Sequence, residues 1–240
     1  MLRRYVSAIG AAHVADGLDD PTKTPLIAAL IGGIARERGT ASEGKAALTP
    51  SDLARIVAAL PETRLGLRDR AIILLGFAAA LRRSEIAALD VADLTFADDG
   101  VELRVRASKT DQRRAGARVF VPIGGALCPV RALRGWLEIS AIEDGALFRR
   151  ISRGDRVMPA RLAGQGVGSA VKRAGEAAGL DAQAIGGHSL RAGFVTEAAK
   201  RGESAFRIMA TTRHRSTESL KAYIRRTANA ARSGFYKELS

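Results

Sequence analysis

The sequence is poor in the residues that build disulfides and metal sites. Its 240 residues include one cysteine, Cys128, and three histidines. A single cysteine cannot form an intrachain disulfide, and one cysteine with three histidines is too few for an ordinary structural zinc site. Because disulfides belong to oxidising compartments, this composition favours a reducing cytoplasm.

Long hydrophobic runs are also missing. The longest, residues 71–81, has about half the length that crosses a membrane, so it predicts a buried core helix. The N-terminal residues, Met1-Leu-Arg-Arg-Tyr, lack the apolar stretch and small-residue cleavage site of a signal peptide. We therefore expect a cytoplasmic protein without a membrane partner.

Acidic residues are outnumbered. The chain has 38 Lys and Arg against 25 Asp and Glu, a formal net charge of +13. Such a charge attracts polyanions over long range, and nucleic acid is the commonest of them, although a generic solvated surface is the alternative. Hydrophobic residues make up 47% of the chain, which is enough to bury a core. The length then predicts one globular domain with a small appendage.

Helical periodicity dominates the chain. Two expected helices, 2–16 and 22–37, precede a polar, glycine-containing linker, and Thr49-Pro50-Ser51-Asp52 has the cap residue, proline and acid of a new helix start. Further helices are expected at 53–60, 69–80, 84–89, 130–140, 160–178, 189–201, 203–211, 216–226 and 228–238.

The middle of the chain changes character. Segments 93–97, 101–106 and 118–122 are rich in β-branched or alternating apolar residues and are separated by turn signals at Asp98-Asp-Gly100 and near Gly116. They predict a small three-stranded antiparallel sheet. The expected fold class is therefore mainly α with a small antiparallel β-sheet (α+β).

Three segments carry groups suited to a phosphodiester: Ala80-Leu-Arg82-Arg-Ser-Glu85, His188-Ser-Leu-Arg191, and His214 followed nine residues later by Tyr223. With Ser189 as a plausible N-cap, His188 and Arg191 would project from one side of a helix start. Each segment alone is weak, because a surface helix or a solvated basic pair explains such residues more often.

The order and spacing of these segments together resemble the tyrosine recombinase (phage integrase) family. The segment at Arg82 is similar to the family's Gly-Leu-Arg-x-Ser-Glu, the segment from His188 to Phe194 to its His-x-Leu-Arg-His-x-Phe, and the spacing from histidine to tyrosine is the same. The resemblance makes 48–240 the catalytic domain and 1–40 the C-terminal remnant of a helical core-binding domain whose first half is missing. The sequence departs from the family's pattern at three positions. Ala80 and Arg213 stand where the family often has glycine, and Ala192 stands where it often has histidine.

The resemblance implies a site-specific DNA recombinase or integrase that cuts and rejoins DNA through a 3′-phosphotyrosyl intermediate, without metal, ATP or another cofactor. Tyr223 would attack the scissile phosphorus. Arg82 and Arg191 would hold the two non-bridging oxygens and stabilise the pentavalent transition state, a role that metal ions fill in other phosphoryl-transfer enzymes.

The same resemblance assigns the proton transfers. His188 would assist proton removal from the tyrosine, and His214 would hydrogen-bond a phosphate oxygen. Lys109, at the expected turn between two strands, would protonate the leaving 5′-oxygen. Lys172 or another residue of the cleft is the alternative proton donor.

The implied partners are double-stranded DNA and further copies of the chain, as a homotetramer on DNA in the nucleoid of a bacterial cytoplasm. Two other functions stay open: a type IB topoisomerase-like DNA-relaxing enzyme and a catalytically impaired DNA-binding remnant. Residues 225–240 favour the recombinase, because they resemble a terminal helix that docks on a neighbouring subunit.

For several other residues we expect roles outside the proposed chemistry, or a choice between two roles. Tyr236 is a rival nucleophile, but no histidine precedes it at the right distance. Glu85 is expected to stabilise its helix start or orient a catalytic neighbour. Arg213 would either perturb the presentation of His214 or add a phosphate contact. A metal-binding carboxylate set is conceivable, but a turn-like setting favours solvated loop residues at Asp90, Asp93, Asp98 and Asp99.

Overall fold

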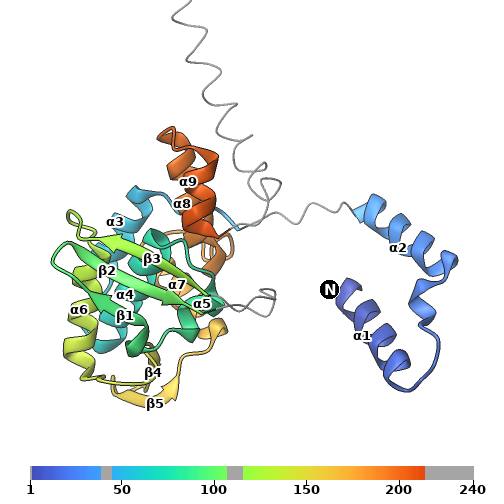
Figure 1. Ribbon diagram of the computed structural model, residues 1–240, viewed down its shortest axis with the longest axis horizontal. Coiled ribbons are helices and arrows are strands. Elements are labelled where there is room, and N and C mark those ends of the chain that lie inside the picture. Colours follow the sequence, from blue (N-terminus) through green and yellow to red (C-terminus); the bar gives the residue numbers. More distant parts are fainter. Residues whose placement is uncertain (1, 39–44, 107–115, 214–240) are drawn as a thin grey trace, which may run out of the picture. The chain divides into compact units, whose positions relative to one another are not determined.

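The computed structural model describes residues 2–38, 45–106 and 116–213. The chain divides into two compact units, Met1–Gly44 and Lys45–Ser240 (Figure 1). Within the described residues, no helix is long and apolar enough to cross a membrane.

The first unit consists of two α-helices, α1 (Leu2–Ala15) and α2 (Pro25–Arg38), joined through the short 3-10 helix η1 (Pro21–Lys23). The Asp20 carboxylate caps η1 by accepting from the Thr22 backbone N–H at 2.9 Å. Among the described residues of this unit only Gly10 is buried. Both predicted helices are present, but they have no core of their own, as expected for a segment this short.

The second unit is mainly helical. Its first helix, α3 (Pro50–Ala59), begins at the predicted place, with Thr49 and Asp52 exchanging capping hydrogen bonds. The apolar run forms most of α4 (Arg64–Ala78), which packs against the other helices of the core and is confirmed as a buried helix. The remaining helices of the described residues are α5 (Arg83–Ala88), η2 (Val91–Asp93), α6 (Pro129–Ser140), α7 (Gly164–Ala177), α8 (Gly187–Lys200) and α9 (Ala205–Thr212). The helices predicted at 216–226 and 228–238 lie outside the described residues.

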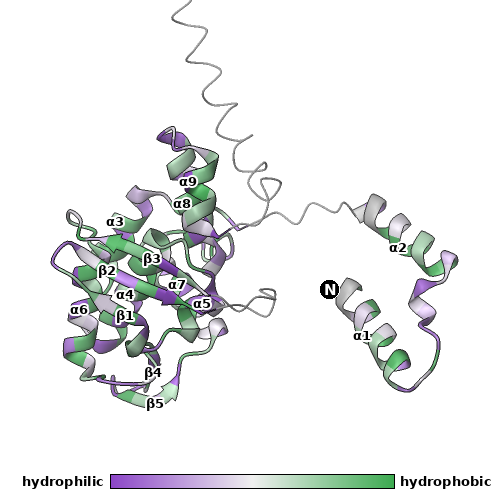
Figure 2. Ribbon diagram, viewed as in Figure 1, coloured by the Kyte–Doolittle hydropathy of each residue, from purple (hydrophilic) through white to green (hydrophobic). Residues whose placement is uncertain are grey.

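The predicted three-stranded antiparallel sheet is confirmed. Strands β1 (Leu94–Phe96), β2 (Gly100–Val105) and β3 (Ala117–Pro122) pair in that order, with Leu103 opposite Leu94 on one side and Val119 on the other. Alternate residues of β2 and β3 enter the core, as a half-buried sheet requires. Figure 2 shows hydrophobic colour on these strands and hydrophilic colour near α5.

A second sheet was not expected. Strands β4 (Arg149–Ile151) and β5 (Val157–Arg161) form an antiparallel pair, so the prediction of a helix beginning at residue 160 was wrong; α7 begins at Gly164. No residue of either strand is buried, and the short segments therefore lack the alternation that reveals a strand. The turn between them caps another helix, because Asp155 accepts hydrogen bonds from the backbone N–H groups that begin α4.

Two glycines allow α8 to pack close to α4. A Cβ on Gly193 would lie 2.1 Å from the Leu48 carbonyl oxygen, and a Cβ on Gly76 would lie 2.8 Å from side-chain atoms of Ile86 and Leu190. Gly193 therefore requires glycine, because a Cβ would meet backbone there, whereas a Cβ at Gly76 would meet only the ends of two side chains. This packing places the start of α8 next to the turn between α4 and α5, where the candidate site lies.

Candidate active site

The turn between α4 and α5 organises the site. Ala80 is fully buried and has φ of 48°, a left-handed conformation that a non-glycine residue rarely adopts. Two residues later, Arg82 is the N-cap of α5, which begins one residue earlier than predicted, and its side chain is 41% exposed. The side chain of Arg82 therefore starts from a fixed backbone position and is still partly open to solvent.

Glu85 orients Arg82, as the sequence predicted. One carboxylate oxygen accepts from Arg82 Nη1 at 2.6 Å, and the other accepts from the Arg82 backbone N–H at 2.8 Å. Glu85 is 8% exposed. Burial by itself would raise the pKa of Glu85, but the Arg213 guanidinium and the Arg82 donors together lower that pKa below its ordinary value, which keeps the carboxylate charged.

Arg191 approaches the same turn from α8. It is 2% exposed, and its Nη1 donates to the Ala80 carbonyl oxygen at 2.8 Å. The backbone of α8 starts earlier than predicted: Gly186 is the N-cap, and Ser189 lies inside the first turn, where its hydroxyl accepts from the Gly186 backbone N–H at 3.0 Å. The expectation of Ser189 as the N-cap residue was therefore wrong, although the hydroxyl still stabilises the helix start.

His188 lies near both arginines, with part of its ring open to solvent. Partial burial, followed by the charges of Arg191 and Arg82, lowers its pKa below the ordinary value for histidine. The imidazole is therefore neutral at pH 7 and can accept a proton. This is the protonation state that a base needs.

A basic cavity of about 520 Å³ opens beside these residues. Arg82 and His188 line it together with the start of α8, whose first backbone N–H groups favour an anion. The cations that complete its lining are Lys45, Arg83 and Lys172. The sequence had singled out Lys172 as an alternative proton donor, but Lys45 is a constituent that no motif indicated.

Asp90 and Asp93 are not the solvated loop residues that the sequence suggested. Asp93 is 2% exposed and its carboxylate accepts from Arg104 and Arg106, the latter also bound to Asp90 at 2.6 Å. Both acids are thus paired with arginines at the C-terminal end of β2. This pairing offsets the free-energy cost of burying a charged carboxylate. In the part of the chain that the structure describes, no three His, Cys, Asp or Glu side chains are arranged to hold a metal ion.

The structure therefore brings three of the six predicted site residues together: Arg82, His188 and Arg191. The other three, Lys109, His214 and Tyr223, lie outside the described residues. Lys109 belongs to the connection between β2 and β3, and His214 directly follows Arg213, the residue that ends α9.

The comparisons with known proteins point to one family. The model of the phage integrase family matches residues 46–230. A curated relative, the "integrase/recombinase xerD homolog" of Selenomonas ruminantium, is 38% identical over 227 residues, which cover 92% of this chain and 67% of the relative. The chain therefore belongs to the phage integrase family.

Solved structures share the fold at low sequence identity. The XerH site-specific recombinase bound to palindromic difH substrate has a TM-score of 0.62 at 16% identity, covering 81% of this chain and 54% of that one. The XerA recombinase has a TM-score of 0.60 at 17% identity, covering 85% of this chain and 67% of that one. The chain thus spans about half of the XerH chain and about two thirds of the other two proteins.

Proposed function

We propose that this protein is a site-specific DNA recombinase that breaks and rejoins strands through a 3′-phosphotyrosyl bond. The observation that carries the proposal is that Arg82 and a neutral His188 line one basic cavity, with Arg191 of α8 close enough to His188 to lower its pKa. Membership of the phage integrase family supports the same chemistry. The formal charge of +13 supports double-stranded DNA as the substrate.

The two arginines supply the electrostatic part of the reaction. Each guanidinium presents paired N–H donors that match phosphate oxygens, and both are held by contacts to the protein before the substrate arrives. Such preorganised donors stabilise the charge that develops in a pentavalent transition state. In this proposal Arg82 and Arg191 each bind one non-bridging oxygen of the scissile phosphate.

Proton transfers complete the proposed reaction. The Tyr223 hydroxyl attacks phosphorus, forms the oxygen–phosphorus bond and releases the 5′-oxygen of the next nucleotide. Neutral His188 assists removal of the phenolic proton, and His214 donates a hydrogen bond to the phosphate. Lys109 delivers a proton to the leaving oxygen, with Lys172, which lines the cavity, as the alternative donor.

A covalent-trapping experiment tests the proposal. The full chain is incubated with a pool of nicked duplexes whose sequence around the nick is randomised, and protein–DNA adducts that survive denaturant are collected and sequenced. We expect adducts with the wild type and with Tyr236→Phe, but none with Tyr223→Phe, which loses only a hydroxyl. Adducts that persist in Tyr223→Phe and vanish in Tyr236→Phe would show that the nucleophile is misassigned.

The same assay separates the alternatives. Absence of adducts with wild-type protein that still binds DNA would favour the impaired DNA-binding remnant. Relaxation of supercoiled plasmid, without exchange of strands between two captured sites, would favour the topoisomerase. Excess EDTA should leave adduct formation unchanged, because the proposed electrophilic groups are guanidiniums and imidazoles.

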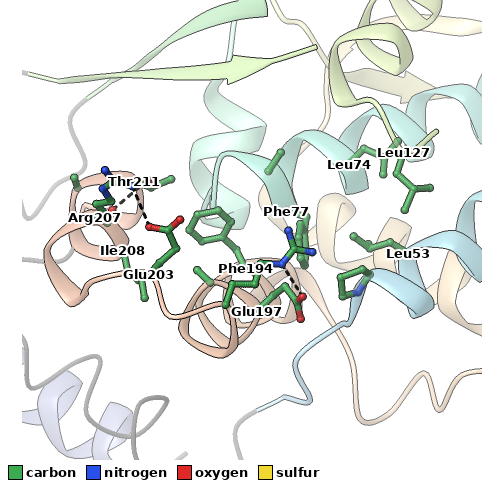
Figure 3. Close-up of a pocket in the computed structure, with 15 residues that line it drawn as sticks. Leu53, Leu74, Phe77, Leu127, Phe194, Glu197, Glu203, Arg207, Ile208 and Thr211 are labelled. Atoms are coloured by element: carbon green, nitrogen blue, oxygen red, sulfur yellow. Dashed lines mark hydrogen bonds and ion pairs between the residues drawn. The ribbon is translucent and has the colours of Figure 1, made fainter. Parts of the chain in front are cut away.

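We also propose that the protein acts as a homotetramer on DNA, with residues 225–240 of one copy docking on the next. An apolar groove of about 650 Å³ between α3, α4, α8 and α9 is a suitable acceptor, because Leu53, Phe77, Phe194 and Ile208 line it (Figure 3). A chain ending at residue 224 and the variant Ala210→Arg, which fills the groove, should bind DNA as smaller complexes in analytical ultracentrifugation. Ala54→Arg, on α3 and outside the groove, is the control.

We propose separately that the two units correspond to two domains of the family. Residues 1–40 correspond to the C-terminal helices of a core-binding domain, and residues 48–240 to the catalytic domain. Exposed apolar side chains on both helices of this unit, such as Tyr5 at 62% and Leu26 at 77%, support a surface that packs on another partner. Deletion of residues 1–40 should weaken DNA binding more than it lowers the stability of the second unit.

A further inference from the structure

The C-terminal end of α9 has an unusual residue. Arg213 is the residue that follows the helix, and it has φ of 58° and ψ of 38° while its backbone N–H donates to the Met209 carbonyl at 2.7 Å. This left-handed ending normally favours glycine, because a side chain crowds the backbone there. An arginine in this conformation suggests that its side chain makes contacts that compensate for the strain.

Those contacts lead to the site. Arg213 Nη2 donates to the Glu85 carboxylate at 2.8 Å, and Nη1 donates to the Thr211 carbonyl at 2.8 Å and lies 3.4 Å from the Ala79 carbonyl. The side chain is 14% exposed. One guanidinium thus joins the end of α9 to the turn between α4 and α5.

The Glu85 carboxylate is therefore shared between two arginines. One of its oxygens accepts from Arg82 Nη1, and the other accepts from the Arg82 backbone and from Arg213. With Arg191 included, the cluster has three positive charges and one negative charge, a sum of +2. Without Arg213 the sum would be +1, and the carboxylate would face Arg82 alone.

These contacts distinguish the two roles that the sequence left open for Arg213. Its donors face a carboxylate and backbone carbonyls inside the protein, so the guanidinium is not directed at a DNA phosphate. Its backbone immediately precedes His214 in the sequence. Anything that fixes Arg213 therefore also fixes the residue to which His214 is covalently joined.

We propose that Arg213 is a positioning residue for strand cleavage. It holds Glu85 in the orientation that aligns Arg82, preserves the positive charge of the cluster, and anchors the end of α9 next to His214. The proposal rests on the proposed recombinase function for its kinetic consequences, but the link between Arg213 and Glu85 can be tested without activity.

The kinetic test compares Arg213→Gly, Glu85→Gln and the double variant on the DNA sequence that the trapping experiment recovers. Glycine suits the left-handed backbone, so Arg213→Gly removes the guanidinium without disturbing the helix end. We expect adduct formation at saturating protein to slow about tenfold in each single variant and by no more than the larger single effect in the double variant. The dissociation constant for DNA should change less than about threefold, because neither residue contacts the phosphate.

Arg55→Ala is the control. It removes the same charge from the second unit, at a side chain on α3 that is 54% exposed and pairs with Asp52, and it should cleave at the wild-type rate. Arg213→Lys keeps the charge but cannot bridge the carboxylate and the carbonyls, so we expect only partial recovery. Wild-type cleavage by Arg213→Gly, or multiplied effects in the double variant, would overturn the proposal.

A second measurement keeps the inference independent of the reaction. The same four proteins are unfolded in urea and followed by the fluorescence of Trp136, the single tryptophan, which is fully buried in the second unit. Coupled residues should give a double variant that is less destabilised than the sum of the single variants. Additive midpoints would disprove the Arg213–Glu85 link, whereas failure of wild-type cleavage would disprove only the recombinase function.

Discussion

The left-handed turn at Ala80 predicts an unusual response to glycine. Ala79 and Ala80 are both fully buried, but Ala79 has φ of −92° and Ala80 has φ of 48°. Replacing either with glycine removes one buried methyl group, worth about 0.8 kcal/mol, and adds backbone entropy to the unfolded chain, worth about 0.5–1 kcal/mol. Only at Ala80 does glycine also relieve a left-handed conformation, worth about 1–2 kcal/mol.

The expected change in the free energy of unfolding therefore differs between Ala79→Gly and Ala80→Gly. We expect Ala79→Gly to lower the free energy of unfolding by about 1–2 kcal/mol. For Ala80→Gly the relief of strain offsets the two losses, and the free energy of unfolding should stay within about 1 kcal/mol of the wild type. The difference between the two variants, about 1–2 kcal/mol, is the quantity of interest because the methyl and entropy contributions cancel in it.

Urea denaturation monitored by Trp136 fluorescence measures this difference, since that side chain is buried in the core of the second unit. The unfolding slope should be the same in both variants, so that midpoints can be compared directly. Equal destabilisation by the two substitutions would refute the reasoning, because it would mean that Ala80 adopts its conformation without strain. A change of slope would instead mean that one substitution altered the extent of unfolding.

Three further predictions concern the core and the reaction. Asp69→Ala should destabilise the second unit by about 3–5 kcal/mol in the same urea assay. The substitution leaves Arg68, which is 4% exposed, without the carboxylate that lies 2.7 Å from its guanidinium. A loss below about 1 kcal/mol would contradict this expectation. The lowered pKa of His188 predicts that adduct formation falls to half of its rate only below about pH 6.5, the ordinary pKa of histidine, whereas half-loss already above that pH would contradict a neutral base. Lys109→Ala should form adducts very slowly on ordinary DNA and much less slowly on DNA with a bridging 5′-sulfur, because a thiolate leaves without a proton. Equal impairment on both substrates would mean that Lys109 only contacts the phosphate.

The sequence predicted those parts of the fold that local patterns determine. The start of α3 follows from Thr49, Pro50 and Asp52, because a cap, a proline and an acid each satisfy a backbone group within the first turn. The three-stranded sheet follows from alternation along β2 and β3. Strands β4 and β5 were missed because they are short and have no buried residue, so neither periodicity nor composition distinguishes them from a loop.

The site was predictable for a different reason. Arg82, His188 and Arg191 were identified by motif order, and the structure supplies the physical basis: the carbonyl of Ala80 accepts from Arg191, two residues before Arg82 begins α5. Contacts between residues far apart in the sequence could not be predicted from the order of motifs. Arg213 and Glu85 are 128 positions apart, and the buried Asp93 of η2 is paired with Arg104 of β2 and with Arg106, which follows that strand.

The two positions where this chain replaces a glycine of the family's pattern, Ala80 and Arg213, are linked in space. Both have positive φ, and the Arg213 guanidinium lies 3.5 Å from the Ala80 carbonyl oxygen. The chain therefore keeps the backbone geometry that glycine normally permits, and holds it with side-chain contacts instead. Because the Ala80 carbonyl also binds Arg191, relaxation of either turn would be transmitted to one of the two proposed catalytic arginines. The arrangement of the site thus depends on two strained residues, each of which is held by groups of the site itself.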